Sequence, residues 1–246
     1  MSASLRLRQH SLICQLADCI EQVWQENLEL SPYTVPEDLG YIEGHLEGEK
    51  LVIENLCYQT PQFRKLHLEL AQVGTGLDIL HCVMFPNPEY ALPIFGADIV
   101  GGRGAISAAI ADLSPVNAER SLPPKYNQAL SSLPNPEFSQ PRALPEWADI
   151  FSGFCFFVRP SGEQEEQSFL SRVRDFLTIH CQIAKAETAL TSKQEVTEVI
   201  AGQQYYCEKQ QQNDKTRRIL EKSFGSEWAD RYMKTMLFDV VKAEDK

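Results

Sequence analysis

The sequence of 246 residues predicts an α/β fold, a three-layer α/β/α sandwich with a central antiparallel sheet. Three observations support this prediction. An amphipathic helix opens the chain, strand-like segments joined by glycine-containing turns follow, and helical periodicity returns towards the C-terminus. Consecutive antiparallel hairpins between helices at both chain ends favour a sheet covered on both faces. Because we find no internal repeat and no clean boundary, we expect a single domain over residues 1–246.

The first helix is expected from about Arg8 to Leu28, before Pro32 and Pro36 break the pattern. Apolar residues recur at helical spacing within it, at Ile13, Leu16, Ile20 and Val23.

Strands are expected between about Tyr41 and Asp112, because apolar and polar residues alternate there. The turn at residues 47–49 separates two of them. Residues 74–76 and 101–104, both rich in glycine, indicate two further hairpin loops.

The second half of the sequence predicts mostly helix. Residues 123–145, rich in Pro, Ser and Asn, are expected to cross the surface with short helical turns. One more strand is expected at Gly153–Arg159, followed by a long helix. Two or three helical pieces are expected from about Gln194 to Val241, with Gly225 as a break.

Composition excludes several function classes. Seven scattered cysteines without a CxxC pair indicate neither a disulfide framework nor a zinc or iron–sulfur site. A net charge of −11 argues against nucleic-acid binding, which needs a basic face. No apolar run approaches the roughly 20 residues of a membrane span, and the first ten residues lead into no signal-type apolar core. We therefore expect a cytoplasmic protein without membrane or nucleic-acid partners.

Polar residues interrupt the two central hairpins where an apolar face is expected. A three-residue loop at 74–76 pairs Val73 with Leu77, so Glu69 lies opposite His81 and His67 opposite Val83. A two-residue loop would instead place Glu69 opposite Leu80. The three-residue loop would gather titratable groups among apolar neighbours, where perturbed pKa values suit proton donation.

The next hairpin extends this face. A four-residue loop at 101–104 pairs Val100 with Ala105, and hence Asp98 with Ser107. Asp98 and Ser107 would then join Glu69 and His81 around a partly apolar pocket. Spacing alone favours a different interpretation, a solvated sheet face with a buried core histidine and a turn-anchoring aspartate.

Three long segments carry a resemblance to a known family: residues 31–86 (SPYTVPEDLGYIEGHLEGEK through DILHCVMFP), 96–115 (GADIVGGRGAISAAIADLSP) and 210–233 (QQQNDKTRRILEKSFGSEWADRYM). The sequence resembles the ferredoxin-dependent bilin reductases from about Pro32 to the C-terminal helix. The resemblance implies an α/β/α sandwich with no bound metal or organic cofactor. It also implies biliverdin IXα as substrate, lying between the sheet and the C-terminal helices, and reduced ferredoxin as the external electron donor.

The resemblance also implies roles for individual residues. His81 and Asp98 match the family's proton-donating pair, and Glu69 matches a carboxylate associated with reduction of the exocyclic vinyl group. Together, His81 and Glu69 resemble the members that reduce biliverdin by four electrons, through bilin radicals, to phycocyanobilin. Five further positions match substrate-binding residues: His67, Ser107, Arg142, Asp214 and Lys215.

Partners and competing functions follow from the same resemblance. Ferredoxins are acidic, so a local basic patch is expected to dock one, and the protein is expected to be a monomer. An ordinary solvated helix face is the alternative explanation of that patch. A family member with another product and a non-catalytic tetrapyrrole carrier are the alternative functions. The cations of the expected patch are Lys209, Lys215, Arg217, Arg218 and Lys222.

Overall fold

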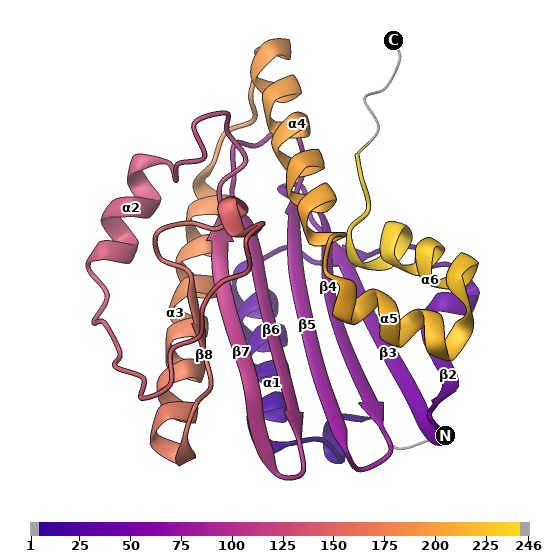
Figure 1. The fold of residues 1–246 in the computed structure, drawn as a ribbon. Coiled ribbons are helices and arrows are strands. Elements are labelled where there is room, and N and C mark those ends of the chain that lie inside the picture. Colours follow the sequence, from indigo (N-terminus) through magenta and orange to yellow (C-terminus); the bar gives the residue numbers. More distant parts are fainter. Residues whose placement is uncertain (1–4, 242–246) are drawn as a thin grey trace.

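The computed structural model describes residues 5–241, which form an eight-stranded antiparallel sheet with helices on both faces (Figure 1). The strand order is β1-β3-β4-β5-β6-β7-β8, and β2 also pairs with β3. The strands are β1 (Ser31–Pro32), β2 (Tyr41–Leu46), β3 (Glu49–Gln59), β4 (Phe63–Val73), β5 (Leu77–Pro86), β6 (Ile94–Gly102), β7 (Ala105–Ser114) and β8 (Phe156–Val158).

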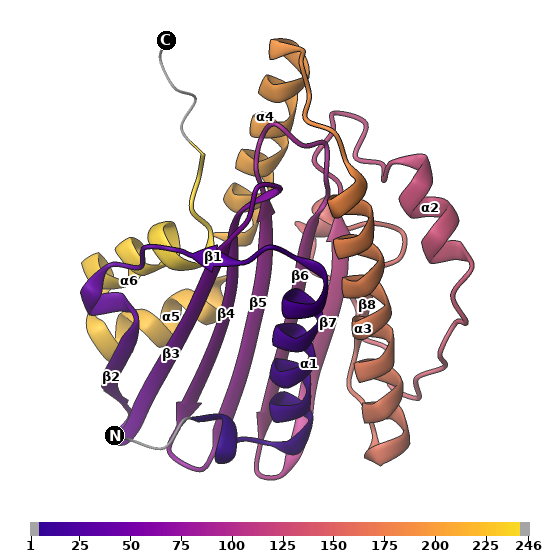
Figure 2. The ribbon, with the colours of Figure 1, turned by 180° about the vertical axis from the view of Figure 1, so that it is seen from behind.

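Helices cover the two faces of the sheet unequally. The long helices α1 and α3 lie side by side on one face (Figure 2), whereas α4, α5 and α6 lie on the other, mainly over β3–β5 (Figure 1). The predicted three-layer α/β/α arrangement is therefore confirmed. The helices are α1 (Ser11–Asn27), α2 (Pro124–Ser131), α3 (Gly162–Ala186), α4 (Lys193–Gln210), α5 (Asp214–Phe224) and α6 (Ser226–Tyr232), with short turns at Leu5–Leu7, Glu37–Leu39, Ala148–Ile150 and a π-helical turn η4 (Met233–Leu237).

Each face of the sheet has its own hydrophobic core. Leu66, Leu68 and Leu70 of β4 pack beneath α1 and α3. Val83 and Phe85 of β5 belong to the second core, beneath the C-terminal helices. Side chains alternate between the two cores along each strand, as the pleat of a sheet requires.

The hairpin between β4 and β5 has the predicted register. Val73 pairs with Leu77 across the three-residue loop, so Glu69 lies opposite His81 and His67 opposite Val83. This register places His67, Glu69 and His81 on the face covered by the C-terminal helices.

The predicted register of the hairpin between β6 and β7 is wrong. Gly102 pairs with Ala105, leaving a two-residue turn at Arg103 and Gly104. Both turn residues have positive φ, 53° and 77°, typical of a type I′ turn that matches the twist of the strands. A register shift after Val100–Ala108 then leaves Ser107 as an extra residue, so Asp98 lies opposite Ile110 and not Ser107.

The C-terminal helices follow the prediction closely. Helices α4, α5 and α6 occupy the segment expected from Gln194, and the break falls at Gly225, which has φ 88°. Gly202 allows α4 to approach the end of β7, since a Cβ there would lie 1.7 Å from the Val116 carbonyl oxygen. Within residues 5–241, every helix is too short or too polar to traverse a lipid bilayer.

Candidate active site

A single row of residues crosses the sheet on the face beneath the C-terminal helices. Asn55 of β3 pairs with Glu69 of β4, and Glu69 pairs with His81 of β5. His81 in turn pairs with Asp98 of β6, which lies opposite Ile110 of β7. The three expected catalytic residues therefore occupy adjacent positions on three neighbouring strands. Directly opposite residues in antiparallel strands have Cβ atoms about 5 Å apart, so these side chains interact.

His81 and Asp98 form a hydrogen-bonded pair. The distance from His81 Nδ1 to Asp98 Oδ1 is 2.6 Å. Burial acts to lower the pKa of His81, but the charge and hydrogen bond of Asp98, with a contribution from Glu69, outweigh it and raise that pKa. The imidazole therefore keeps its proton to a higher pH than an isolated histidine, as a proton donor requires.

One nitrogen of His81 remains without a partner. Its Nε2 is buried and makes no hydrogen bond within the described residues. An unpaired buried donor costs roughly 1–3 kcal/mol, so this nitrogen is a candidate to donate to a bound ligand. Phe238 covers the ring edge-on, with ring centroids 5.7 Å apart.

Glu69 is buried and bonded to one residue of α6. The Tyr232 hydroxyl lies 2.5 Å from Glu69 Oε2. Burial raises the pKa of Glu69, while His81 and the Tyr232 hydrogen bond act in the opposite direction. A buried carboxyl with a raised pKa keeps its proton to a higher pH than an exposed one, which suits a role as an acid.

His67 is a buried neutral base next to this pair. Its Nε2 lies 2.7 Å from Asn55 Oδ1, and its ring contacts that of His81 edge-on at 5.8 Å. Burial, together with the charges of Lys65 and His81, lowers the pKa of His67 well below 6.5. The two histidines of this face therefore have opposite protonation preferences.

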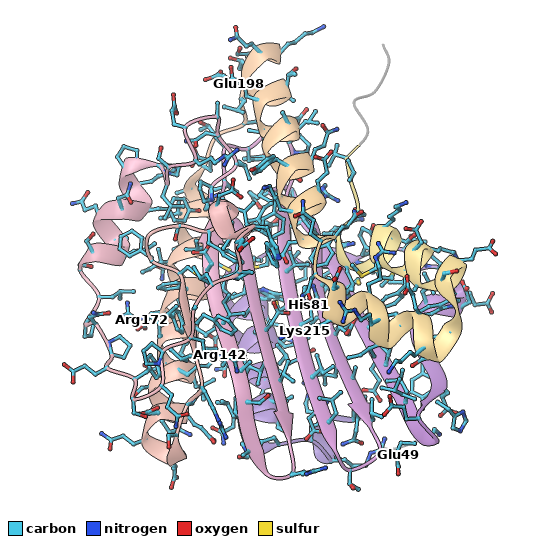
Figure 3. The ribbon with its side chains drawn as sticks, in the orientation of Figure 1. Glu49, His81, Arg142, Arg172, Glu198 and Lys215 are labelled. Carbon is cyan, nitrogen blue, oxygen red and sulfur yellow. The ribbon has the colours of Figure 1, made fainter. Side chains whose placement is uncertain are left out.

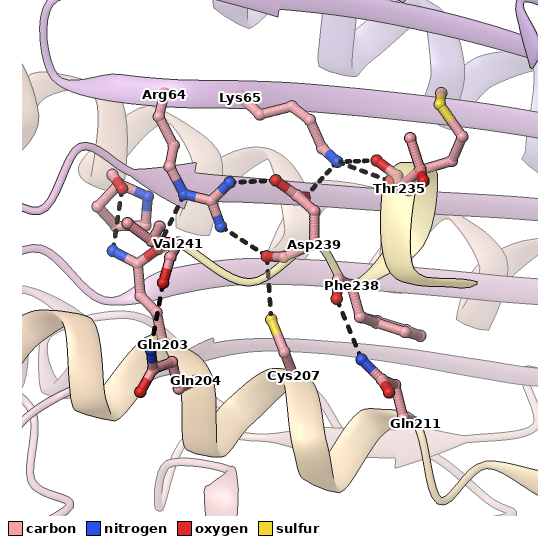
Figure 4. A network of polar contacts seen from close by, with 12 residues as sticks. Arg64, Lys65, Gln203, Gln204, Cys207, Gln211, Thr235, Phe238, Asp239 and Val241 are labelled. Carbon is pink, nitrogen blue, oxygen red and sulfur yellow. Dashed lines mark hydrogen bonds and ion pairs between the residues drawn. The ribbon is translucent and has the colours of Figure 1, made fainter. Parts of the chain in front are cut away.

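A buried ion-pair network fixes the C-terminal segment against the sheet (Figure 4). The Lys65 side chain is fully buried; its Nζ contacts Asp239 and donates to the Met236 carbonyl oxygen at 2.8 Å. Arg64 binds the other oxygen of Asp239. Burial opposes ionisation of Asp239, but the two cations hold its pKa below the usual value. The network positions the adjacent Phe238 over His81.

The part of this face on β6 to β8 is only partly covered. Asp98, Val100 and Ile110 are all half-exposed, in contrast to the buried residues that alternate with them. Phe157 of β8 pairs with Ile110 and continues the apolar surface. A half-exposed apolar floor next to buried acids suits a flat, largely hydrophobic ligand.

The predicted substrate-binding cations lie at the margins of this floor (Figure 3). Arg142 lies over the Phe157 ring, 5.1 Å from its centroid, and donates to the Ser107 carbonyl oxygen at 2.5 Å. Ser107 is exposed, and its hydroxyl donates to the Val100 carbonyl oxygen at 3.0 Å. Ser107 therefore lies beside Arg142 and away from Glu69.

Asp214 and Lys215 begin α5 and are both exposed. Asp214 pairs with Arg218 at 2.8 Å, whereas Lys215 has no ion pair among residues 5–241. Lys215 is therefore available to an anionic group.

Most cations of the predicted basic patch are paired with carboxylates. Lys209 lies 3.4 Å from Asp149, and Lys222 lies 2.9 Å from Glu47. Arg217 contacts Asp230 at 3.6 Å. The pairing acids come from other segments of the chain, so counting charges along α4 and α5 overstates the local positive charge.

A family model described as "Ferredoxin-dependent bilin reductase" matches residues 17–239. The chain belongs to the ferredoxin-dependent bilin reductase family. Curated relatives named "Phycocyanobilin:ferredoxin oxidoreductase" include one from Trichodesmium erythraeum, 58% identical over 233 residues and covering 95% of each chain. Another, from Synechococcus elongatus, is 59% identical over 237 residues and 96% of each chain.

A solved structure supports the fold of this family member. The crystal structure of tomato phytochromobilin synthase in complex with biliverdin matches with a TM-score of 0.74. The match covers 91% of this chain and 81% of that one, at 18% sequence identity. At this identity the likeness establishes the α/β arrangement alone.

Sequence reasoning missed three residues that support the acids, one from β3 and two from the C-terminal part of the chain. Asn55 and Tyr232 flank Glu69, and Phe238 covers His81. A simple three-residue loop at residues 60–62 would have paired Asn55 with His67, but the strands pair two residues further along β4, with Tyr58 opposite Leu66 and Asn55 opposite Glu69. The contacts of Tyr232 and Phe238 depend on how α6 and η4 pack, which no local pattern indicates.

Proposed function

We propose that this protein reduces biliverdin IXα by four electrons to phycocyanobilin, with reduced ferredoxin as the electron donor. The observation that carries the proposal is the row Glu69–His81–Asp98 next to the half-exposed apolar floor of β6 to β8. Family membership supplies the reaction class, and the near-full-length relatives named for phycocyanobilin supply the product.

The acids in the row have distinct parts in the proposed mechanism. Each electron added to a conjugated tetrapyrrole raises its basicity, so a proton must follow. Asp98 is the acid nearest solvent, its side chain 43% exposed, and it shares a hydrogen bond with His81. We assign the proton supplied to the bilin system to this pair and the proton used in reducing the exocyclic vinyl group to Glu69.

The two marginal cations would orient the substrate. Arg142 is anchored by the Ser107 carbonyl and the Phe157 ring, and Lys215 is free of ion pairs among residues 5–241. Their charges suit the two propionates of biliverdin. Of the other two predicted substrate-binding residues, Asp214 precedes Lys215 in α5, whereas His67 is buried beside His81. Binding the propionates at the margin leaves the conjugated rings over the apolar floor, within reach of the row.

The proposed chemistry uses no resident metal or organic cofactor. A bilin delocalises an unpaired electron over its own conjugated system, so single electrons from ferredoxin can be accepted directly by the substrate. The protein then has to supply protons and exclude water. We expect the purified protein to contain no stoichiometric iron or flavin, which metal analysis and absorption spectroscopy would check.

Ferredoxin is proposed to dock at the predicted basic patch on α4 and α5. The ion pairs there are exposed, and exposed pairs contribute only about 0–1 kcal/mol, so carboxylates of a partner can replace the internal ones. The rate of reduction at limiting ferredoxin should fall as salt concentration rises, and an unchanged rate would argue against docking by charge.

The decisive experiment mixes the protein with biliverdin anaerobically and then adds reduced ferredoxin. We expect the absorption spectrum of bound biliverdin to give way to that of phycocyanobilin, with the product verified by chromatography. A bound biliverdin spectrum that reduced ferredoxin leaves unchanged would indicate a carrier. A different reduced bilin would indicate another specificity within the family.

A further inference from the structure

The hydroxyl of Tyr232 lies between two acceptors. It is 2.5 Å from Glu69 Oε2 and 3.0 Å from Asn55 Oδ1. A hydroxyl carries one proton and can therefore donate to only one of them at a time. The Tyr232 side chain is fully buried and stacks on Trp228 with ring centroids 5.0 Å apart, so the ring is held still while the O–H bond can rotate.

Asn55 is a fixed acceptor. Its Nδ2 donates to the Leu39 carbonyl oxygen at 2.7 Å, and its backbone N–H donates to the Gly40 carbonyl oxygen at 2.9 Å. Turning the amide over would place Oδ1 against the Leu39 carbonyl oxygen, where both groups are acceptors. The Asn55 oxygen therefore faces Tyr232 whatever the protonation state of Glu69.

We propose that Tyr232 is a positioning residue for Glu69, and that its hydroxyl proton changes acceptor when Glu69 gives up its own proton. This inference rests on the proposed role of Glu69 as an acid. While Glu69 is protonated, it donates to the Tyr232 oxygen and Tyr232 donates to Asn55. After the proton has left, Tyr232 donates to the carboxylate.

Protons and electrons balance in this step. The O–H bond of Glu69 breaks and the same proton forms a bond to the bilin, which has already received an electron from ferredoxin. The Tyr232 proton stays on Tyr232 and only turns from Asn55 to Glu69. Glu69 is thus hydrogen-bonded in both of its protonation states, without any rearrangement of heavy atoms.

The arrangement favours the state that exists after proton transfer. A hydrogen bond to a carboxylate is roughly twice as strong as one between neutral groups, so Tyr232 stabilises Glu69 most after the proton has gone. The bond therefore opposes the burial that raises the pKa of Glu69. The titratable groups that act on Glu69 are His81 of β5, Tyr232 of α6 and Asp98 of β6. Glu69 in turn acts on Cys57 of β3, and His67 is its neighbour on the same face of β4.

Two variants test the proposal because it requires their effects to have opposite signs. In Tyr232→Phe the carboxylate loses its donor, so we expect the pKa of Glu69 to rise by about one unit or more. In Asn55→Leu the Tyr232 proton has Glu69 as its remaining acceptor, so we expect that pKa to fall. The measurement is an infrared titration of the neutral carboxyl band in the ligand-free protein, assigned by its loss in Glu69→Gln.

Activity provides a second readout with a matched control. We expect Tyr232→Phe to lower the rate of the vinyl-group reduction about tenfold and to move the alkaline limb of its pH profile upward. Tyr126→Phe removes an equally buried hydroxyl from the opposite face of the sheet, and it should leave both the band and the profile unchanged.

The outcomes separate this inference from the proposed function. Shifts of the Glu69 band in the same direction in both variants, or no shift in Tyr232→Phe, would overturn the role of Tyr232. Failure of the wild-type protein to form phycocyanobilin would overturn the proposed function, and the infrared titration would still report on the hydrogen bond.

Discussion

His180 on one face of the sheet and His81 on the other are both buried, but their pKa values are shifted in opposite directions. On the face covered by α1 and α3, His180 contacts the Tyr126 hydroxyl at 2.8 Å and packs against Phe63, and burial lowers its pKa to about 3. On the opposite face His81 is buried beside Asp98, and its pKa is raised. The imidazole is the same, so the neighbouring carboxylate decides whether it stays neutral or holds a proton.

The comparison extends to the surrounding strand residues. Leucines of β4 alternate with His67 and Glu69, so one strand contributes an apolar side to one core and a polar side to the other. The apolar face can be stabilised by packing alone. The polar face needs a network of partners, because each buried polar group is costly unless hydrogen-bonded. Both faces contribute a hydrophobic core, and we infer that the face with the polar network also performs the chemistry.

The largest effect expected is that of Asp98→Asn on product formation. The amide preserves the size of the side chain and can still bond to His81, but it lacks the negative charge that raises the pKa of His81, so the pair holds its proton less well. Phycocyanobilin formation should fall about a hundredfold or more, with biliverdin binding retained. Product chromatography and binding titration check this. Unchanged turnover would show that Asp98 is not needed to supply the proton.

Glu69→Gln should allow one of the two reductions and block the other. The near-isosteric amide leaves the apolar floor and the marginal cations intact, so biliverdin should bind normally. The reaction should halt after one of the two reductions and accumulate a two-electron-reduced bilin, detected by chromatography. Complete conversion at the wild-type rate would remove Glu69 from the mechanism.

Lys65→Met tests the network that supports the polar face. Removing one partner of a buried ion pair leaves the other charge poorly compensated, although Arg64 still contacts Asp239. We expect the free energy of unfolding to fall by about 3 kcal/mol, measured by urea denaturation. A decrease of less than about 0.5 kcal/mol in the free energy of unfolding would mean that Lys65 does not hold the C-terminal segment in place.

Stability should also depend on pH through Glu69. The folded-state pKa of Glu69 is raised above the ordinary 4.5, so the stabilisation of the folded protein by the Glu69 proton is fully present below that pH. The contribution is lost as pH rises through the folded-state pKa. The free energy of unfolding of Glu69→Gln, measured relative to wild type, should therefore increase as pH rises above about 4.5. A difference that stays constant with pH would show that Glu69 titrates normally.

The smallest effect expected belongs to the apolar face. Tyr126→Phe removes one buried hydrogen bond to His180 and should cost about 1 kcal/mol of stability. Product formation should be unchanged, since the variant lies across the sheet from the row. A tenfold loss of activity would show that the face covered by α1 and α3 also affects the reaction.

The sequence predicted the fold, and it predicted the pairing of Glu69 with His81 from one of the two loop lengths considered. Alternation fixed the faces of β4 and β5, and the three-residue loop fixed the pairing of Glu69 with His81. The loop at residues 101–104 contains three glycines and permits several turns, so its register could not be chosen. The type I′ turn and the bulge moved Ser107 away from Asp98.

Long-range contacts account for the rest. Tyr232 and Phe238 reach the row, and Asp239 reaches Lys65, only because α6 and η4 pack on the sheet, and periodicity does not specify that packing. The basic patch was overestimated for the same reason, since Glu47 and Asp149 approach it from distant segments.

The most direct test of the division between the two faces is electron paramagnetic resonance of the Asp98→Asn protein with bound biliverdin. One electron is delivered by reduced ferredoxin under anaerobic conditions. If the polar face supplies protons while ferredoxin supplies electrons, an organic radical should form at the wild-type rate and then persist, with little product. A radical that decays as fast as in wild type, with normal phycocyanobilin formation, would contradict the account.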